Sequence, residues 1–142
     1  MLRREADKYF SRYVRLRDSE VIEEQFWGKC ITCEKRFLIA FRDPVTGKLR
    51  FTNLVDNGHF VSRGYMATRY EEENCNLQCK RCNKWLNGNL TKYRVALDEK
   101  YGDGTAEKLE HMALENKGLT KLYLEEVIHD SKEQIKFYEA AL

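Results

Sequence analysis

The 142-residue sequence has no long apolar segment and no secretory leader. No run approaches the roughly 18 apolar residues of a membrane-spanning helix. The first ten residues, MLRREADKYF, lack the apolar stretch of a signal peptide. Internal repeats and low-complexity segments are missing too. These absences argue against membrane and secreted proteins, and they predict a cytoplasmic protein without a membrane partner, of a length that suits one domain.

A large charge excess is also missing, since the net charge is +2, but the charges are unevenly distributed. Residues 1–101 carry 20 Lys and Arg against 14 Asp and Glu, whereas residues 102–142 carry 5 against 9. The basic part is suited to a polyanion such as nucleic acid, and the acidic C-terminal part is less so.

Four of the five cysteines form two CxxC pairs, Cys30/Cys33 and Cys79/Cys82. In a reducing compartment this pattern indicates a metal site, and Zn²⁺ takes four thiolates at tetrahedral angles. A redox CxxC needs only one pair, and buried free thiols do not explain two equal spacings. We therefore predict a structural zinc that clamps both ends of the 45-residue segment between the pairs. Cys75 belongs to neither pair, and we expect it to be a small buried residue.

The apolar pattern divides the chain into three parts. Residues 1–26 are predicted to be an N-terminal helical segment, residues 27–101 to be the zinc-bound core, and residues 102–142 to be a C-terminal helical region. Within these parts we expect a β-hairpin around the turn DPVTGK, short strands near residues 54–60 and 77–78, and helices over 80–101, 105–115 and 119–142.

His59, in DNGHFVSRG, is the only histidine in the first 110 residues. A lone histidine is more often structural than catalytic. Here, however, Asn74 follows it and Asn83 comes directly after the last cysteine of the second pair. A neutral imidazole near pH 7 is a competent general base. The three residues therefore form a candidate catalytic set.

The order His, Asn, then CxxC followed by Asn resembles the HNH, or ββα-metal (His-Me finger), nuclease motif, and in particular the endonuclease VII-type junction resolvases. The resemblance implies an α+β fold with a zinc-clamped ββα-metal core and flanking N- and C-terminal helices. It also implies that His59 is the general base, that Asn74 organises the loop between the strands, and that Asn83 binds a catalytic Mg²⁺ or Mn²⁺.

Five sequence blocks extend a second resemblance over nearly the whole chain: YFSRYVRLRD, CITC, DNGHF, RYEEENCNLQCKRCN and GNLTKYRVAL. Their order and spacing resemble the NinG (Rap) family of phage recombination nucleases. This resemblance implies a phage-encoded, Mg²⁺-dependent DNA endonuclease that cuts branched recombination intermediates, such as Holliday junctions and D-loops, in the bacterial cytoplasm.

Two symmetric nicks in a junction would require two active sites, so a homodimer is expected if this function holds. The apolar stripes of residues 6–26 and 119–142 are candidates for the dimer contact. The alternative is that these helices pack together within one chain.

One position departs from the HNH pattern. Many of these nucleases carry Asp directly before the histidine as a metal ligand, whereas this chain has Gly58. Asp56 is therefore the candidate second Mg²⁺ ligand. Strand alternation would point Asp56 and His59 to opposite faces unless Gly58 bends the chain. The alternative is that Asp56 only forms a turn in Asp-Asn-Gly.

Basic residues surround the candidate set, and phosphate contacts are their functional interpretation, with a solvated face as the alternative. The candidates are Arg63, Arg69, Lys80, Arg81 and Lys84. Asn87 is either an added ligand or a helix cap, and His111 and His129 are expected to be surface or core residues.

Two other functions remain open: an HNH nicking or restriction-type endonuclease on duplex DNA, and a non-catalytic zinc DNA-binding module.

Overall fold

In the computed structural model, which describes residues 1–142, the chain begins with helix α1 (Leu2–Arg17). Its buried residues Ala6, Phe10 and Val14 recur at intervals of four, so they form one apolar stripe. The helix ends at Arg17 because Asp18 leaves helical geometry, and the side chain of Asp18 accepts a hydrogen bond from the backbone amide of Leu77 (2.9 Å).

The next residues form a hairpin, not a helix. Strands β1 (Ser19–Ile22) and β2 (Gln25–Lys29) pair antiparallel, with Ile22 opposite Gln25. The turn consists of Glu23 and Glu24, both with positive φ (49° and 63°), which suits a two-residue hairpin. The prediction of helix up to residue 26 was therefore wrong beyond Arg17, because a Glu-Glu turn has no Asn-Gly signal.

Strands β1 and β2 continue into a four-stranded antiparallel sheet of order β1-β2-β3-β4, with β3 (Arg36–Arg42) and β4 (Leu49–Phe51) as its second hairpin. The side chain of Asp43 accepts hydrogen bonds from the amides of Val45 (2.8 Å) and Thr46 (3.2 Å) and so stabilises the turn. The predicted hairpin around DPVTGK is confirmed.

A separate antiparallel ribbon pairs β5 (Val55–His59) with β6 (Cys75–Cys79). The loop between the two strands contains two short 3₁₀ turns, η1 (Met66–Thr68) and η2 (Glu72–Asn74). Strands were predicted near both places, and both are present. The register pairs Asp56 with Gln78 and His59 with Cys75, which brings the candidate base beside the strand that leads to the second cysteine pair.

After β6 the chain makes a π-helical turn, η3 (Arg81–Trp85), and only later begins helix α2 (Leu90–Tyr101). Between them Asn87, Gly88 and Asn89 all have positive φ (49°, 89° and 48°). Left-handed residues interrupt a right-handed helix, so the prediction of one helix from 80 to 101 was wrong in its first part.

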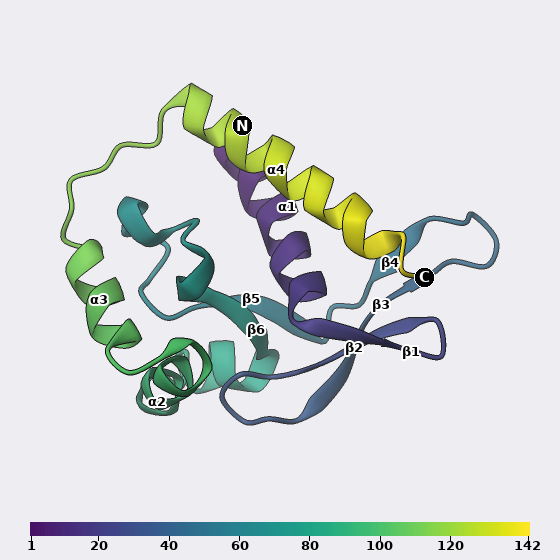
Figure 1. Ribbon diagram of the computed structural model, residues 1–142, viewed down its shortest axis with the longest axis horizontal. Helices are drawn as coiled ribbons and strands as arrows, with labels where there is room; N and C mark the ends of the chain where they lie inside the picture. Colours follow the sequence, from purple (N-terminus) through teal and green to yellow (C-terminus); the bar gives the residue numbers. More distant parts are fainter.

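Helices α3 (Thr105–Met112) and α4 (Lys121–Glu139) complete the fold. Figure 1 shows α4 lying beside α1, so the two ends of the chain pack together. Leu124 and Ile128 of α4 join Phe10 of α1 in one core cluster, and each buried side chain of this kind contributes about 1.5–3 kcal/mol. The apolar stripes considered for dimer contact thus meet within the chain.

None of the helices is long and apolar enough to span a membrane. The chain has the predicted α+β fold with terminal helices, and the β5–β6 ribbon and η3 lie between the sheet and helices α2 and α3 (Figure 1).

Candidate metal centre and adjoining cleft

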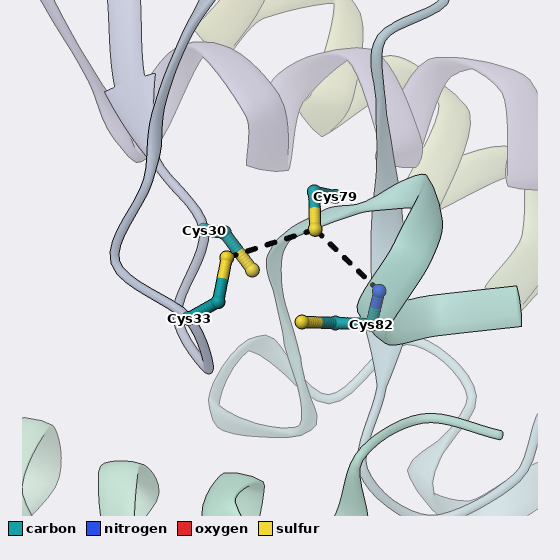
Figure 2. Close-up of side chains that lie close together, drawn as sticks. All are labelled: Cys30, Cys33, Cys79 and Cys82. Carbon is teal, nitrogen blue, oxygen red and sulfur yellow. Dashed lines mark hydrogen bonds between the residues drawn. The ribbon is translucent and has the colours of Figure 1, made fainter. Parts of the chain in front are cut away.

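The four paired cysteines come together from two separate turns. Cys30 and Cys33 lie on the loop between β2 and β3, and Cys79 and Cys82 lie where β6 passes into η3 (Figure 2). Their sulfur atoms all lie within 4.8 Å of one another, and those of Cys33 and Cys79 are 3.7 Å apart. Tetrahedral Zn²⁺ with Zn–S bonds of about 2.3 Å places its sulfurs roughly 3.8 Å apart. The cluster therefore fits a structural zinc site.

Polar neighbours support the cluster. The Thr32 hydroxyl lies 3.3 Å from the Cys30 sulfur. Gln78 Nε2 donates to Thr32 Oγ1 (3.3 Å) and to the Gly88 carbonyl (2.8 Å), so one buried side chain ties the first cysteine turn to the loop after η3. Burial raises the pKa of Cys30, but hydrogen bonds from Thr32 and backbone amides outweigh it and lower that pKa, which favours the metal-binding thiolate.

A polar cleft of about 490 Å³ adjoins the cysteine cluster. Three of the residues proposed from the sequence, Asp56, His59 and Asn83, line it together. The full set of polar lining residues is Asp7, Ser11, Asp56, Asn57, His59, Ser62, Arg63, Asn83, Lys84 and Asn87. These residues come from α1, β5, the following loop and the η3 region, so the cleft collects four distant parts of the chain.

Asp56 and Asn83 meet in this cleft. Asn83 Nδ2 lies 3.0 Å from Asp56 Oδ2, and Lys80 Nζ lies 2.5 Å from Asp56 Oδ1. Carboxylate and amide oxygens are hard ligands of the kind that divalent cations take. In this structure the amide nitrogen of Asn83, not its oxygen, faces the carboxylate. In this structure the Lys80 ammonium supplies the positive charge beside the Asp56 carboxylate. A divalent ion would compete with Lys80 for that carboxylate.

Gly58 lies between Asp56 and His59, and a side chain does not fit there. A Cβ atom at this position would lie 2.1 Å from Gln78 Oε1 and 2.7 Å from its Cβ. An aspartate directly before the histidine would therefore displace Gln78, which supports the cysteine cluster. Position 58 therefore has no room for a carboxylate, and Asp56 provides the carboxylate beside Asn83.

His59 has a defined tautomer. Its Nε2 lies 2.9 Å from the carbonyl oxygen of Arg69, and since a carbonyl only accepts, Nε2 carries the proton and Nδ1 keeps its lone pair. Burial lowers the pKa of His59, and the charges of Arg63 and Arg69 lower it further against the raising effect of the hydrogen bond to the Arg69 carbonyl. The imidazole is thus neutral at pH 7.

Asn74 is fully buried beside the loop that follows His59. Its Oδ1 accepts a hydrogen bond from the Val61 amide (2.8 Å), and its Nδ2 donates to the carbonyls of Val61 (3.0 Å) and Thr68 (3.1 Å). One side chain therefore fixes both ends of segment 61–68. Asn74 does not line the cleft, so its geometry is that of a positioning residue.

The basic residues divide into three groups. Arg63 and Lys84 are exposed and line the cleft, while Arg81 is exposed beside the cysteine cluster, in a different hollow. Lys80 is paired with Asp56. Arg69 is buried, and its guanidinium bonds Asp7 at 2.6 Å and the Arg63 carbonyl at 2.8 Å, so it joins the loop to α1 and does not face solvent.

Sequence reasoning missed the contribution of α1. Asp7 accepts hydrogen bonds from Arg69 and from the hydroxyl of Tyr70 (2.7 Å). Burial opposes its ionisation, but these bonds and the Arg69 charge hold the pKa of Asp7 below its usual value. Asp7 and Ser11 are one turn apart on the helix, and nothing in their sequence context distinguished them from surface residues.

Asn76 and Tyr93 were likewise missed as positioning residues. The Tyr93 hydroxyl donates to the Gly58 carbonyl (2.6 Å) and accepts from Asn76 Nδ2 (3.3 Å). Asn76 Oδ1 in turn accepts from Lys100 Nζ and Tyr101 Oη, both at 2.7 Å. This buried network anchors strand β5, directly before His59, to helix α2.

Cys75 lies apart from the four-cysteine cluster, buried in the core beneath α1 and α4. Burial raises the pKa of its thiol, so it stays protonated. The prediction of a small buried residue is confirmed.

Comparison with known proteins agrees with the sequence blocks. The model of a family described as bacteriophage lambda NinG protein matches residues 2–140, which is nearly the whole chain. Neither the curated proteins nor the solved structures provide a match. The family model spans both cysteine pairs, the cleft and both terminal helices. This chain therefore belongs to the family of the bacteriophage lambda NinG protein.

Proposed function

We propose that the protein is a Mg²⁺- or Mn²⁺-dependent endonuclease that cleaves branched DNA, including Holliday junctions and D-loops. The observation that carries this proposal is the meeting of Asp56, His59 and Asn83 in one polar cleft beside the four-cysteine cluster. The order of elements, a strand with His59, a loop, a second strand and a helical turn with Asn83, is the order expected of a ββα-metal core.

His59 is the general base in this proposal. Its neutral imidazole lines the cleft, and Nδ1 has the free lone pair that can accept a proton from the attacking water. The Arg69 carbonyl holds the ring by Nε2, and Asn74 holds the loop that carries Arg69. A base that is positioned in this way needs little rearrangement before it reacts.

Asp56 and Asn83 are the proposed ligands of the catalytic cation. When bound, a divalent ion supplies positive charge for the scissile phosphate and the leaving oxygen. Rotation of the Asn83 amide would turn its oxygen toward the same point as the Asp56 carboxylate. Lys80 would then be released from Asp56 to contact a phosphate, as Arg63 and Lys84 do from the rim of the cleft.

The structural zinc and the catalytic cation have separate ligands in this proposal, although Cys82 and Asn83 are adjacent. Thiolates select Zn²⁺, whereas carboxylate and amide oxygens select Mg²⁺. Two copies of the chain would provide the two active sites that paired nicks in a junction require. The surface that would join the copies lies outside the α1–α4 contact, because that contact is filled within one chain.

A cleavage assay on a synthetic four-way junction tests the proposal. The wild type with Mg²⁺ should leave paired nicks, and His59→Ala should bind the junction but cut about 10²–10⁴-fold more slowly, because general bases contribute that much. Asp56→Ala should need more Mg²⁺ for half-maximal cleavage. His129→Ala, which changes an exposed histidine on α4, is the matched control and should cut like the wild type.

The same assay separates the other functions. Equal cleavage of a linear duplex would favour a nicking or restriction-type enzyme. Binding without any cleavage, with zinc retained and Mg²⁺ or Mn²⁺ present, would favour a zinc-stabilised binding module. Unchanged cleavage by His59→Ala would exclude His59 as the base, and sedimentation as a monomer with and without junction DNA would exclude the dimer.

A further inference from the structure

A second hollow, of about 410 Å³, lies between α1, the β3–β4 hairpin and α4. It is separate from the cleft. Its charged and aromatic lining residues are Tyr9, Arg12, Lys48, Phe51, Lys132, Lys136 and one acid, Glu139. Figure 1 shows β4 near the C-terminal end of α4, with α1 alongside that helix. Two of its cations, Lys132 and Lys136, come from the C-terminal part whose overall charge is acidic.

Two aromatic rings in this region are surrounded by cations. Arg12 and Arg15 lie over Phe51, with Cζ 5.4 and 4.9 Å from the ring centroid. Lys132 lies 4.7 Å from the centroid of Tyr9, which Lys8 and Arg12 also approach, at 5.3 and 5.9 Å. These contacts hold flexible side chains near fixed positions. The rings are therefore covered by cations, which leaves little aromatic face for a base to stack on.

Most of these cations lack a carboxylate partner. Lys8, Arg12, Arg15 and Lys48 take part in none of the ion pairs of the structure. Lys132 and Lys136 have only weak ones, to Glu5 at 4.0 Å and to Glu133 at 3.5 Å. The remaining nearby acid, Glu139, faces Arg42 at 3.3 Å. The region therefore has more positive charges than its few weak ion pairs neutralise.

The crowding of these charges is unfavourable in the free protein. Burial and the neighbouring Arg12 lower the pKa of Arg15 to about 10, against the attraction of Asp56. An external anion near Arg12 and Arg15 would relieve this repulsion.

Helix α1 connects the second hollow to the cleft. Asp7 and Ser11 line the cleft, while Tyr9 and Arg12 line the second hollow. The cleft and the second hollow are therefore separate, but both contain residues of one helix.

We propose that Lys8, Arg12, Arg15, Lys48, Lys132 and Lys136, here termed the α1–α4 basic surface, bind the phosphodiester backbone of a duplex DNA arm that leads away from the cleft. This inference rests on the proposed function in taking DNA as the ligand, and it adds a second contact outside the cleft. These cations have no ion pair or only a weak one, and their spread over three elements fits a row of phosphates. The covered rings disfavour stacking of unpaired bases.

The test measures binding of a fluorescent duplex and a four-way junction by anisotropy, in Mg²⁺-free buffer at 50–200 mM salt. Lys132→Gln/Lys136→Gln should weaken binding about tenfold. It should also reduce the slope of log affinity against log salt by about 1.8, because each lost phosphate contact removes about 0.9. Adding Lys48→Gln should remove about one further unit of slope.

The matched control is Lys117→Gln/Lys121→Gln. It makes the same change in net charge at the first residue of α4 and in the segment before it, outside the α1–α4 basic surface. This variant should bind with the slope of the wild type. Circular dichroism should give the same spectrum and melting temperature for all variants, because the substituted lysines are exposed.

Unchanged affinity and salt slope in Lys132→Gln/Lys136→Gln would overturn the inference, as would an equal loss in the control pair. Since no step in this assay requires cleavage, its outcome is separate from that of the proposed nuclease activity. A protein that cuts junctions but shows no effect of these substitutions keeps the proposed function and loses the second contact. A protein that binds duplex through this surface but does not cut junctions keeps the second contact and loses the proposed function.

Discussion

The four-cysteine cluster and the cleft lie side by side, yet they are built in opposite ways. The cluster takes its ligands from two local turns, is largely buried and offers only sulfur. The cleft takes its residues from four distant segments, is open to solvent and offers oxygen and nitrogen. Cys82 and Asn83 are adjacent residues on η3, one in each site. One turn thus carries a residue of the buried sulfur cluster and a residue of the open polar cleft.

The largest expected effect tests whether the cleft depends on the cluster. Cys79→Ser/Cys82→Ser should lose zinc, unfold β6 and η3, and abolish cleavage. The physical reason is that zinc binding supplies about 10–16 kcal/mol in small zinc domains, comparable to the stability of a whole domain. Metal content measures the loss of zinc, and thermal melting measures the loss of stability. Cys75→Ala is the control and should keep zinc, and a double variant that still folds and cuts would contradict the dependence.

An intermediate effect is expected when the loop beside the cleft, residues 61–68, loses its support. Asn74→Ala leaves the Val61 amide and the Val61 and Thr68 carbonyls without their partner, at about 1–3 kcal/mol for each group that stays unpaired. Urea unfolding should show this loss, and cleavage should fall while zinc content stays at one ion per chain. Asn116→Ala, at an exposed asparagine, should change neither quantity. Loss of zinc from Asn74→Ala would mean that the two sites are not separable.

The smallest effect is a pH dependence confined to the cleft. Burial lowers the pKa of His59 in the folded state, whereas the unfolded state takes up the proton near its ordinary value of about 6.5. The free energy of unfolding should therefore fall as pH drops below about 6.5, and the His59 contribution should be constant above it. Cleavage should rise with pH as the His59 imidazole loses its proton, with a midpoint below the ordinary histidine value of about 6.5.

His59→Gln removes this titrating group and provides the comparison. Urea unfolding between pH 5 and 8 should show a shallower dependence for the variant than for the wild type. Identical pH dependences in the two proteins would show that His59 is not buried as a neutral imidazole.

Much of the cysteine cluster could be predicted from the sequence because its ligands come in local pairs. A CxxC turn places two sulfurs close together wherever it lies, so only the approach of the two turns had to be inferred. The hairpin around DPVTGK was equally local, since Asp43 and Gly47 specify the turn themselves. The hairpin at Glu23 and Glu24 had no such residues and was mistaken for helix.

The cleft was predicted only in part. His59, Asn74 and Asn83 were singled out by their order along the chain, but neither Asp7 nor Gln78 carried a signal. Asp7 reaches the cleft because α1 packs over the loop that contains Arg69, and Arg69 turned inward for the same reason. Whether Asp56 and His59 share a face was open in the sequence, because strand alternation and the bend at Gly58 favoured opposite answers.

The sequence by itself determined the family, the two cysteine pairs and the helices at both ends, because each of these depends on residues that are close together along the chain or on blocks in a fixed order. Only the tertiary structure decided that Asp56 meets Asn83, that Arg69 bonds Asp7, and that Lys132 and Lys136 of an acidic segment join the arginines of α1. These contacts depend on how distant elements pack, and that packing is set by the whole core.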